Sequence, residues 1–241
     1  MRLKNLSDRI YFLESDDEKG LPALGYIKGE VFSMMVDAGA TPAHAALFIA
    51  HLGENGLQEP VFTVVTHHHW DHAYGLSALE TISISCRKCA EKLQMLSDGE
   101  WDEAFLEKQV KNEAVSVLTL DNFRKCYPDL SEIEVFSTDI AFDGEMNMDL
   151  GGCHAVVKQI PSSHSRDCVA VYVPEEKVLF IGDGAESAHV GRNIADDRDE
   201  LIALQKLLRN LDFTKCIRSH KGVMSKDEIL RDLADRLSEV I

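Results

Sequence analysis

Hydrophobic and polar residues follow a strand-like pattern in three short runs near the start of the chain. The runs are Arg9–Leu13, Ala23–Lys28 and Val31–Val36, and turn-forming residues separate them, so we expect a meander of three β-strands. Thr41 then occupies a typical position for a helix cap, and Ala43–Leu52 supplies the apolar face of the helix that follows. The chain therefore changes from β to α structure near residue 40.

A continuous apolar run, Val61–Val65, is typical of a strand that is buried on both faces. This run leads directly to His67, so we expect a group of histidines at the carboxyl end of a buried strand. The alternation of α and β structure continues beyond it. The predicted elements are a short helix at Ala73–Leu79, a strand at Thr81–Ser85 and a helix at Cys86–Leu96 with Ser85 as its cap.

The stretch from about residue 98 to residue 134 interrupts this alternation. Trp101–Val110 has helical spacing and many charges, whereas Asn122–Glu132 has no regular period and contains Pro128. We predict that residues 98–134 form an insertion or a lid within a single domain that spans residues 1–241.

Strand-like patterns return in the second half of the chain and are followed by helices. The predicted strands are Glu134–Thr138, Ala141–Phe142, Met146–Met148, Ala155–Ile160, Cys168–Val173, Val178–Ile181 and Cys216–Arg218. Arg198–Asn210 is an amphipathic helix, and the capping box of Ser225 and Glu228 begins another. Strands and helices thus occur twice in the same order. This order fits an α/β fold in which two sheets face each other and helices cover their outer faces.

Charge and composition exclude several classes of function. The chain has 25 Lys and Arg against 41 Asp and Glu, a net charge of −16, and no basic stripe, so we expect no extended nucleic-acid surface. No apolar window approaches the roughly 18 residues of a membrane span, and the polar segment Met1–Asp8 does not resemble a signal peptide. We expect a cytoplasmic protein that binds no membrane, and the six scattered cysteines suit reduced thiols.

The segment Thr66–His72 contains four histidines and an aspartate. Neutral imidazoles and carboxylates are the ligands that zinc-type metals prefer, and a divalent cation would neutralise so dense a cluster. A catalytic four-coordinate zinc uses three protein ligands and a water. His67, His69, Asp71 and His72 of this segment are therefore more ligands than one metal uses. The sequence therefore predicts two metal ions.

Spacing assigns directions to the side chains within this segment. In an extended chain, residues two apart point to the same side, so His67, His69 and Asp71 converge. His68 and Trp70 point to the other side, where packing or support of the ligands is the expected role.

The motif His-x-His-x-Asp-His at 67–72 resembles the signature of the metallo-β-lactamase-fold metallohydrolase superfamily, in particular its hydroxyacylglutathione hydrolase and lactonase-like branch. The remaining positions of the family pattern are filled by His164 in Pro-Ser-Ser-His-Ser, Asp183 in Phe-Ile-Gly-Asp-Gly and His220 in Arg-Ser-His-Lys-Gly. The resemblance implies a four-layered αβ/βα sandwich of two mixed sheets. It also implies that His67, His69 and His164 hold one metal, that Asp71, His72 and His220 hold the other, and that Asp183 bridges both.

The resemblance further implies a hydrolase with two divalent metal ions, Zn²⁺ being the first expectation and Fe or Mn the alternatives. A metal-bridging hydroxide would attack an ester, thioester or lactone carbonyl, and Asp71 and Asp183 would be the catalytic carboxylates that orient it. A phosphodiesterase on the same metal centre is the alternative, with Arg166, Arg192 and Lys221 as cations for the phosphate. A non-haem iron oxidoreductase is a third, weaker alternative.

The sequence leaves the identity of the substrate open. We expect a small molecule as the partner, and a homodimer is compatible with the sequence. The residues left open as substrate contacts are Tyr74, Arg166, His189, Arg192 and Lys221.

Overall fold

The computed structural model describes residues 1–112 and 114–240, and most of its strands belong to two mixed sheets. The first sheet has seven strands in sequence order. The strands before β5 pair antiparallel, and those from β4 onward pair parallel. The strands are β1 (Leu3–Asn5), β2 (Ile10–Leu13), β3 (Leu24–Lys28), β4 (Ser33–Val36), β5 (Phe62–Val64), β6 (Ile82–Cys86) and β7 (Ile140–Phe142).

The second sheet has six strands in the order β15-β14-β11-β10-β9-β8. Only β11 and β14 pair parallel, and the other neighbours are antiparallel. The strands are β8 (Glu145–Asp149), β9 (His154–Gln159), β10 (Val169–Val173), β11 (Val178–Gly182), β14 (Lys215–Arg218) and β15 (Gly222–Ser225). A separate hairpin is formed by β12 (Ala188–Val190) and β13 (Asn193–Ala195).

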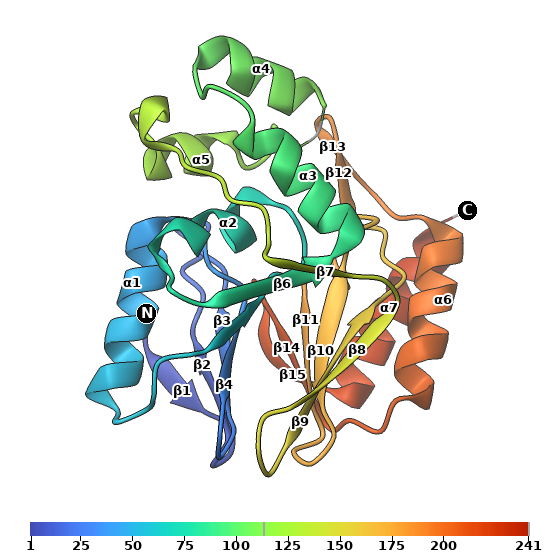
Figure 1. Cartoon of the computed structure of the whole chain (residues 1–241). Helices are drawn as coiled ribbons and strands as arrows, with labels where there is room; N and C mark the ends of the chain where they lie inside the picture. Colours follow the sequence, from blue (N-terminus) through green and yellow to red (C-terminus); the bar gives the residue numbers. More distant parts are fainter. Residues whose placement is uncertain (113, 241) are drawn as a thin grey trace.

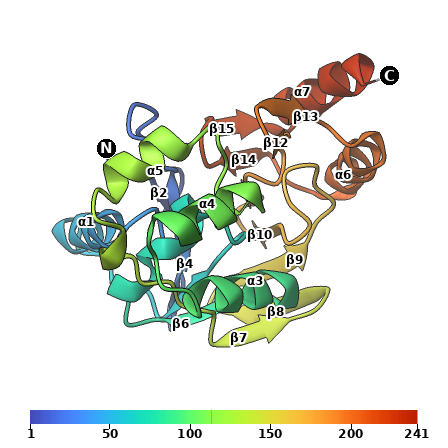
Figure 2. The same cartoon turned by 90° about the horizontal axis from the view of Figure 1, so that it is seen from above.

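Three apolar clusters define four layers. The largest cluster lies between the two sheets and joins residues such as Ile27 and Val36 of the first sheet to Val157 and Val171 of the second. A second cluster packs α1 (Pro42–Glu54) on the outer face of the first sheet, and a third packs α6 (Arg198–Asn210) and α7 (Lys226–Glu239) on the outer face of the second. Figures 1 and 2 show these helices at opposite ends of the molecule. The predicted sandwich is therefore confirmed.

Helices α3 (Arg87–Ser97), α4 (Glu103–Lys111) and α5 (Leu120–Cys126) lie across one end of the sandwich, above the strand ends in Figure 1. An aromatic cluster fixes α5 to the helix α2 (Trp70–Ala73): the ring of Phe123 packs edge-on against Trp70, and it also contacts Trp101 and Tyr127. The helix α5 replaces part of the irregular stretch expected at residues 122–132. The expectation missed it because its stability comes from this tertiary packing and not from a regular apolar period.

The strand expected at Glu134–Thr138 is wrong. This segment has alternating buried and exposed residues, yet it pairs with no strand, and its polar groups bind side chains and loops instead: the Ser137 hydroxyl donates to the Ala90 carbonyl, and Thr138 Oγ1 lies 2.7 Å from Ser85 Oγ. Ser85 is also not the cap of α3. The helix begins one residue later, and Cys86 is at the cap position without a side-chain hydrogen bond.

The short strands β1, β12, β13 and β15 were not predicted, because none of their residues is buried and they lack the apolar pattern of a core strand. None of the helices within residues 1–112 and 114–240 has both the length and the apolar content that crossing a membrane requires. All six cysteines are free thiols, in agreement with the expectation from their scattered positions.

Candidate metal centre

The seven predicted ligand residues come together at one end of the two sheets, beneath α3, α4 and α5. Each lies just beyond a strand: the histidine segment follows β5, His164 follows β9, Asp183 follows β11 and His220 follows β14. Their ligand atoms form two groups, each within 4.8 Å. One group is His67, His69 and His164, and the other is Asp71, His72, Asp183 and His220.

The backbone changes conformation within the histidine segment, and this change separates the two groups. His69 itself is extended, with φ −61° and ψ 148°, and α2 begins at Trp70. The predicted convergence holds for His67 and His69, although the chain bends at His67 and His68 and so does not alternate as a straight strand. It does not apply to Asp71, which lies in the first turn of α2 next to His72, so the helix directs both toward the second group.

The first group consists of three imidazoles whose nitrogens lie close together. His67 Nε2 is 3.0 Å from His69 Nδ1 and 3.2 Å from His164 Nε2, and the last two nitrogens are 2.9 Å apart. Burial and the neighbouring imidazoles lower the pKa of His67 and of His69 well below the ordinary value. These imidazoles are therefore neutral near pH 7, the form in which histidine binds metals.

Hydrogen bonds on the far side of two rings fix which nitrogen carries the proton. His164 Nδ1 lies 3.0 Å from the Ser187 carbonyl, which only accepts, so Nδ1 donates and Nε2 keeps its lone pair. The Thr66 hydroxyl donates to Asp37 and lies 3.1 Å from His67 Nδ1, so it accepts from that ring and leaves His67 Nε2 unprotonated. Two lone pairs thus face each other, and a cation between them would remove their repulsion.

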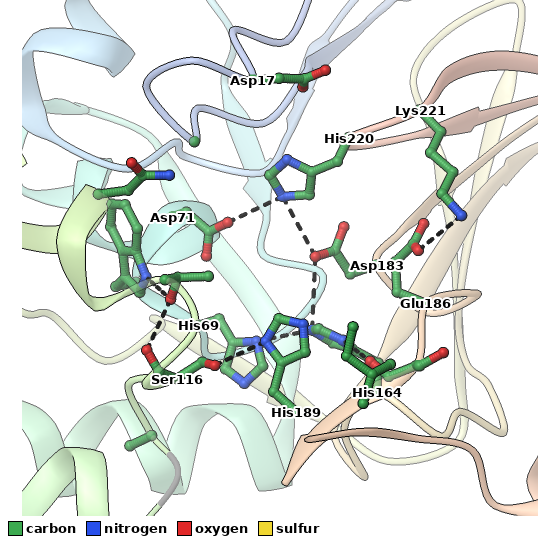
Figure 3. Close-up of a pocket in the computed structure, with 17 residues that line it drawn as sticks. Asp17, His69, Asp71, Ser116, His164, Asp183, Glu186, His189, His220 and Lys221 are labelled. Carbon is green, nitrogen blue, oxygen red and sulfur yellow. Dashed lines mark hydrogen bonds and ion pairs between the residues drawn. The ribbon is translucent and has the colours of Figure 1, made fainter. Parts of the chain in front are cut away.

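The second group combines two carboxylates with two imidazoles. Asp71 Oδ2 lies 3.2 Å from His220 Nε2 and 3.5 Å from His72 Nε2 (Figure 3 draws the first contact). Asp183 Oδ2 lies 3.4 Å from His72 Nε2 and 3.5 Å from His220 Nε2. The same oxygen is 3.7 Å from His164 Nε2, so Asp183 stands between the two groups.

The carboxylates dominate the electrostatics of this second group. Burial by itself would lower the pKa of His220, but Asp183 and Asp71 raise it to about 9. Burial likewise opposes ionisation of Asp183, but His220 and His72 hold its pKa well below the ordinary value. The site therefore presents ionised carboxylates that attract positive charge, either protons on the histidines or a bound cation.

The geometry fits metal ions in two independent ways. His72 Nε2 and Asp183 Oδ1 are buried and have no hydrogen-bond partner among the described residues, although burying an unpaired polar atom costs free energy. In addition, bonds of about 2.0–2.1 Å in a tetrahedral zinc site separate neighbouring nitrogens by about 3.3–3.4 Å. The nitrogens of the first group, 2.9–3.2 Å apart, have nearly that spacing.

Asp37 supports the centre from behind, a role that the sequence did not reveal. Its carboxylate accepts hydrogen bonds from the Thr66 backbone at 2.7 Å and the Thr66 hydroxyl at 3.0 Å, and its Oδ2 lies 2.7 Å from His72 Nδ1. Asp37 has φ 63°, a left-handed conformation that is uncommon outside glycine and asparagine or aspartate. The sequence signal for this residue is the turn Asp37-Ala-Gly39 that directly follows β4.

His68 is the centre of a second supporting network, in agreement with its expected direction away from the metals. Its Nδ1 lies 3.0 Å from Asp167 Oδ2, and its backbone N–H donates to the same carboxylate at 2.9 Å. Lys92 donates to Asp167 at 2.8 Å and to Ser165 at 3.2 Å. This network ties the end of β5 to the loop that carries His164.

A cavity of about 500 Å³ opens over the two groups, and Figure 3 shows the residues around it. His69, Asp71, His164, Asp183 and His220 line its floor. Volumes of this size are typical of small-molecule sites.

The five residues whose contact with substrate the sequence did not decide lie in different places. His189 and Lys221 line the cavity over the metal groups, and Arg166 lines a neighbouring one, whereas Arg192 lines neither among the described residues. Tyr74 is 1% exposed and packs against Trp101, so it belongs to the aromatic cluster.

Comparison of the chain with protein families gives one match, to the model described as the metallo-beta-lactamase superfamily, over residues 25–220. The chain belongs to the metallo-beta-lactamase superfamily. Membership of this superfamily accounts for the hydrolase-type fold and for the two His/Asp groups suited to divalent metal ions. The family resemblance expected from the sequence is thereby confirmed. A comparison with curated protein sequences gives no match.

Solved structures show the same superfamily fold at low sequence identity. A metallo-beta-lactamase from Pontibacter korlensis is 16% identical, with a TM-score of 0.69 and 98% of each chain covered. The archaeal superfamily protein ST1585 from Sulfolobus tokodaii is 19% identical, with a TM-score of 0.67 and coverage of 95% of this chain and 86% of that one. The sec-alkylsulfatase Pisa1 from Pseudomonas sp. is 16% identical, with a TM-score of 0.64; the match covers 98% of this chain but only 41% of Pisa1.

Proposed function

We propose that the protein is a dinuclear metal-dependent hydrolase that cleaves an ester, thioester or lactone. One observation carries this proposal: two groups of ligand atoms, each within 4.8 Å, meet at Asp183 beneath a cavity large enough for a small substrate. His67, His69 and His164 would hold the first divalent ion. Asp71, His72 and His220 would hold the second, with Asp183 between them. Neutral imidazoles and carboxylates favour Zn²⁺, with Fe or Mn as alternatives.

Two divalent ions in these positions would supply a water that ionises near neutral pH and positive charge for the developing oxyanion of a carbonyl substrate. The side chains of the chain itself supply orientation. Asp71 and Asp183 present carboxylate oxygens on the floor of the cavity, where they can accept a hydrogen bond from a water and later hold its proton. The Ser187 carbonyl and the Thr66 hydroxyl hold the rings of His164 and His67 in one orientation.

The charges around the cavity favour a carbonyl substrate over a phosphodiester. The cations considered for a phosphate are occupied or distant: Arg166 is paired with Asp197 at 2.9 Å and with Glu200, and Lys221 is paired with Glu186 at 3.3 Å. Arg192 does not line the cavity among the described residues. Among the described residues that line this cavity, there is therefore no unpaired Arg or Lys to bind the phosphate of a phosphodiester.

Metal analysis and a substrate panel test the proposal together. Protein purified without added metal should contain close to two equivalents of a divalent metal, and His72→Ala, which removes a ligand of the second group only, should lower this to about one. The metal-loaded protein should hydrolyse a thioester, a lactone or an aryl ester faster than bis(4-nitrophenyl) phosphate. Preference for the phosphodiester would favour the alternative hydrolase, and iron as the dominant metal without hydrolysis would favour the oxidoreductase. Absence of bound metal would refute all three.

A further inference from the structure

A second cavity of about 500 Å³ adjoins the one over the metal groups. The two cavities share His69, Ala114, Ser116, His164 and His189 as lining residues. His189 Nδ1 lies 2.9 Å from Ser116 Oγ, so this pair connects the segment before α5 to the β12–β13 hairpin across the boundary of the two spaces (Figure 3). A substrate whose carbonyl lies over the metal groups would therefore have a second compartment for the rest of the molecule.

One face of α4 forms a polar wall of this second cavity. Phe105, Lys108, Gln109 and Asn112 line it and recur at the spacing of a single helical face. Gln109 is only 7% exposed, yet its side-chain amide makes no hydrogen bond to any described residue. Because this amide lines the cavity, its donor and acceptor are available to a ligand that enters.

Lys108 supplies an available positive charge beside this amide. Within residues 1–112 and 114–240 it forms no ion pair, and its Nζ lies over the Phe105 ring at 6.0 Å from the ring centre. The other two cations of the cavity are already engaged. Lys92 donates to Asp167 and Ser165 and lies 3.4 Å from His68 Nδ1, and Arg166 is paired with Asp197 and Glu200.

The opposite walls of the second cavity are apolar. Met95 and Leu96 of α3 and Val190 of β12 line it, and Met95 and Val190 are exposed at 65% and 47%. Exposed apolar side chains around a cavity with a few polar groups are typical of a site for a ligand with an apolar body. The first cavity, in contrast, has the carboxylates of Asp17 and Glu186 on its walls, which would repel an anionic end.

We propose that the second cavity is a substrate subsite for an acyl chain of medium length that ends in a carboxylate. The apolar walls contact the chain, Lys108 forms an ion pair with the terminal carboxylate, and the Gln109 amide donates a hydrogen bond to it. This inference rests on the proposed hydrolysis of acyl bonds and specifies its substrate class.

A matched pair of esters tests the subsite in the metal-loaded protein. The 4-nitrophenyl monoester of adipic acid and 4-nitrophenyl hexanoate have acyl chains of the same length. The chain of the first ends in a carboxylate and that of the second in a methyl group. We expect kcat/KM to be about tenfold higher for the adipate ester, the effect of one hydrogen bond to a charged group. Lys108→Met and Gln109→Met should each reduce this ratio, and Lys108→Met should bring it close to one.

Lys111→Met is the matched control, because Lys111 is an exposed lysine of the same helix that does not line the cavity. This variant loses the same charge and should keep the ratio of the parent protein. A ratio that is unchanged in Lys108→Met, or that falls equally in Lys111→Met, would overturn the subsite.

Direct binding separates failure of the subsite from failure of the proposed function. Calorimetric titration of the zinc-loaded protein with 4-phenylbutyrate should show about tenfold weaker binding in Lys108→Met than in Lys111→Met. If neither ester is hydrolysed but this difference appears, the acyl hydrolase is wrong and the anion subsite stands. Equal affinity in both variants refutes the subsite, whatever the turnover assay shows.

Discussion

The carboxylate of Asp37 lies 2.7 Å from Nδ1 of His72, on the side of the ring that faces away from the second ligand group. This contact keeps a proton on Nδ1 and leaves Nε2 facing Asp71 and Asp183, where it would bind the metal. The two residues are 35 positions apart, yet one carboxylate holds both His72 and the strand end at Thr66.

Asp37→Asn should weaken the second metal site selectively. Loss of a carboxylate that orients a metal-binding histidine typically costs about 10–100-fold in metal affinity. We expect this loss for the second equivalent of zinc and a smaller one for the first, whose ligand His67 contacts Asp37 only through Thr66. Competition with a chromophoric chelator measures both affinities. Asp139→Asn is the control, because Asp139 accepts similar hydrogen bonds from Ser83 far from the centre. If Asp37→Asn bound both equivalents of zinc as tightly as the parent protein does, the supporting role would be contradicted.

Asp183→Asn should affect both metal sites and turnover. Its carboxylate oxygen is 3.4 Å from His72 Nε2 and 3.7 Å from His164 Nε2, so the amide removes one negative charge shared by the two groups. We expect the metal content to fall from two equivalents toward one and kcat to fall by at least about 100-fold. Elemental analysis and steady-state kinetics on the same preparation provide the measurement. Unchanged metal content and rate would show that Asp183 does not bridge.

Removal of the metals should lower the thermal stability reversibly. A ligand at 100 times its Kd stabilises the folded state by about 2.7 kcal/mol, and each kcal/mol shifts Tm by about 2–4 °C in a chain of this size. We therefore expect dialysis against a chelator to lower Tm by about 5–10 °C and added zinc to restore it. The variant His67→Ala combined with His72→Ala should show little response to either treatment, and a full response in that variant would place the metals elsewhere.

Arg218→Met should destabilise the protein even without metal. Arg218 is fully buried and donates to Glu186 at 2.5 Å and to Asp232 at 2.9 Å, joining the end of β14 to α7 and to the loop after Asp183. Removing one partner of a buried ion pair costs about 3–5 kcal/mol, because the remaining charges lose their compensation.

Urea denaturation of the chelator-treated protein measures this loss. The exposed pair of Arg87 and Asp143 provides the control, since Arg87→Met should change the free energy of unfolding by less than about 1 kcal/mol. A similar small change in Arg218→Met would mean that Glu186 and Asp232 are compensated by other groups, such as Lys221 and Arg236.

Features that depend on local chemistry could be predicted from the residues alone. A buried strand that runs into four histidines predicted a metal centre, and the close spacing of His67 and His69 correctly predicted that these two side chains converge. The capping box of Ser225 and Glu228 likewise predicted where α7 begins, because its hydrogen bonds join residues three positions apart. The family motif supplied the distant ligand positions.

The grouping of distant side chains became apparent in the folded chain. Asp71 joins His72 and Asp183 because α2 begins at Trp70, and the Asp37 carboxylate reaches His72 because β4 and β5 pair in parallel and end side by side. The expected strand at Glu134–Thr138 has the right alternation but no partner, and α5 forms on an aromatic cluster rather than on its own period. The physical reason is the same in each case: strand pairing, orientation of side chains and burial depend on neighbours that are remote along the chain.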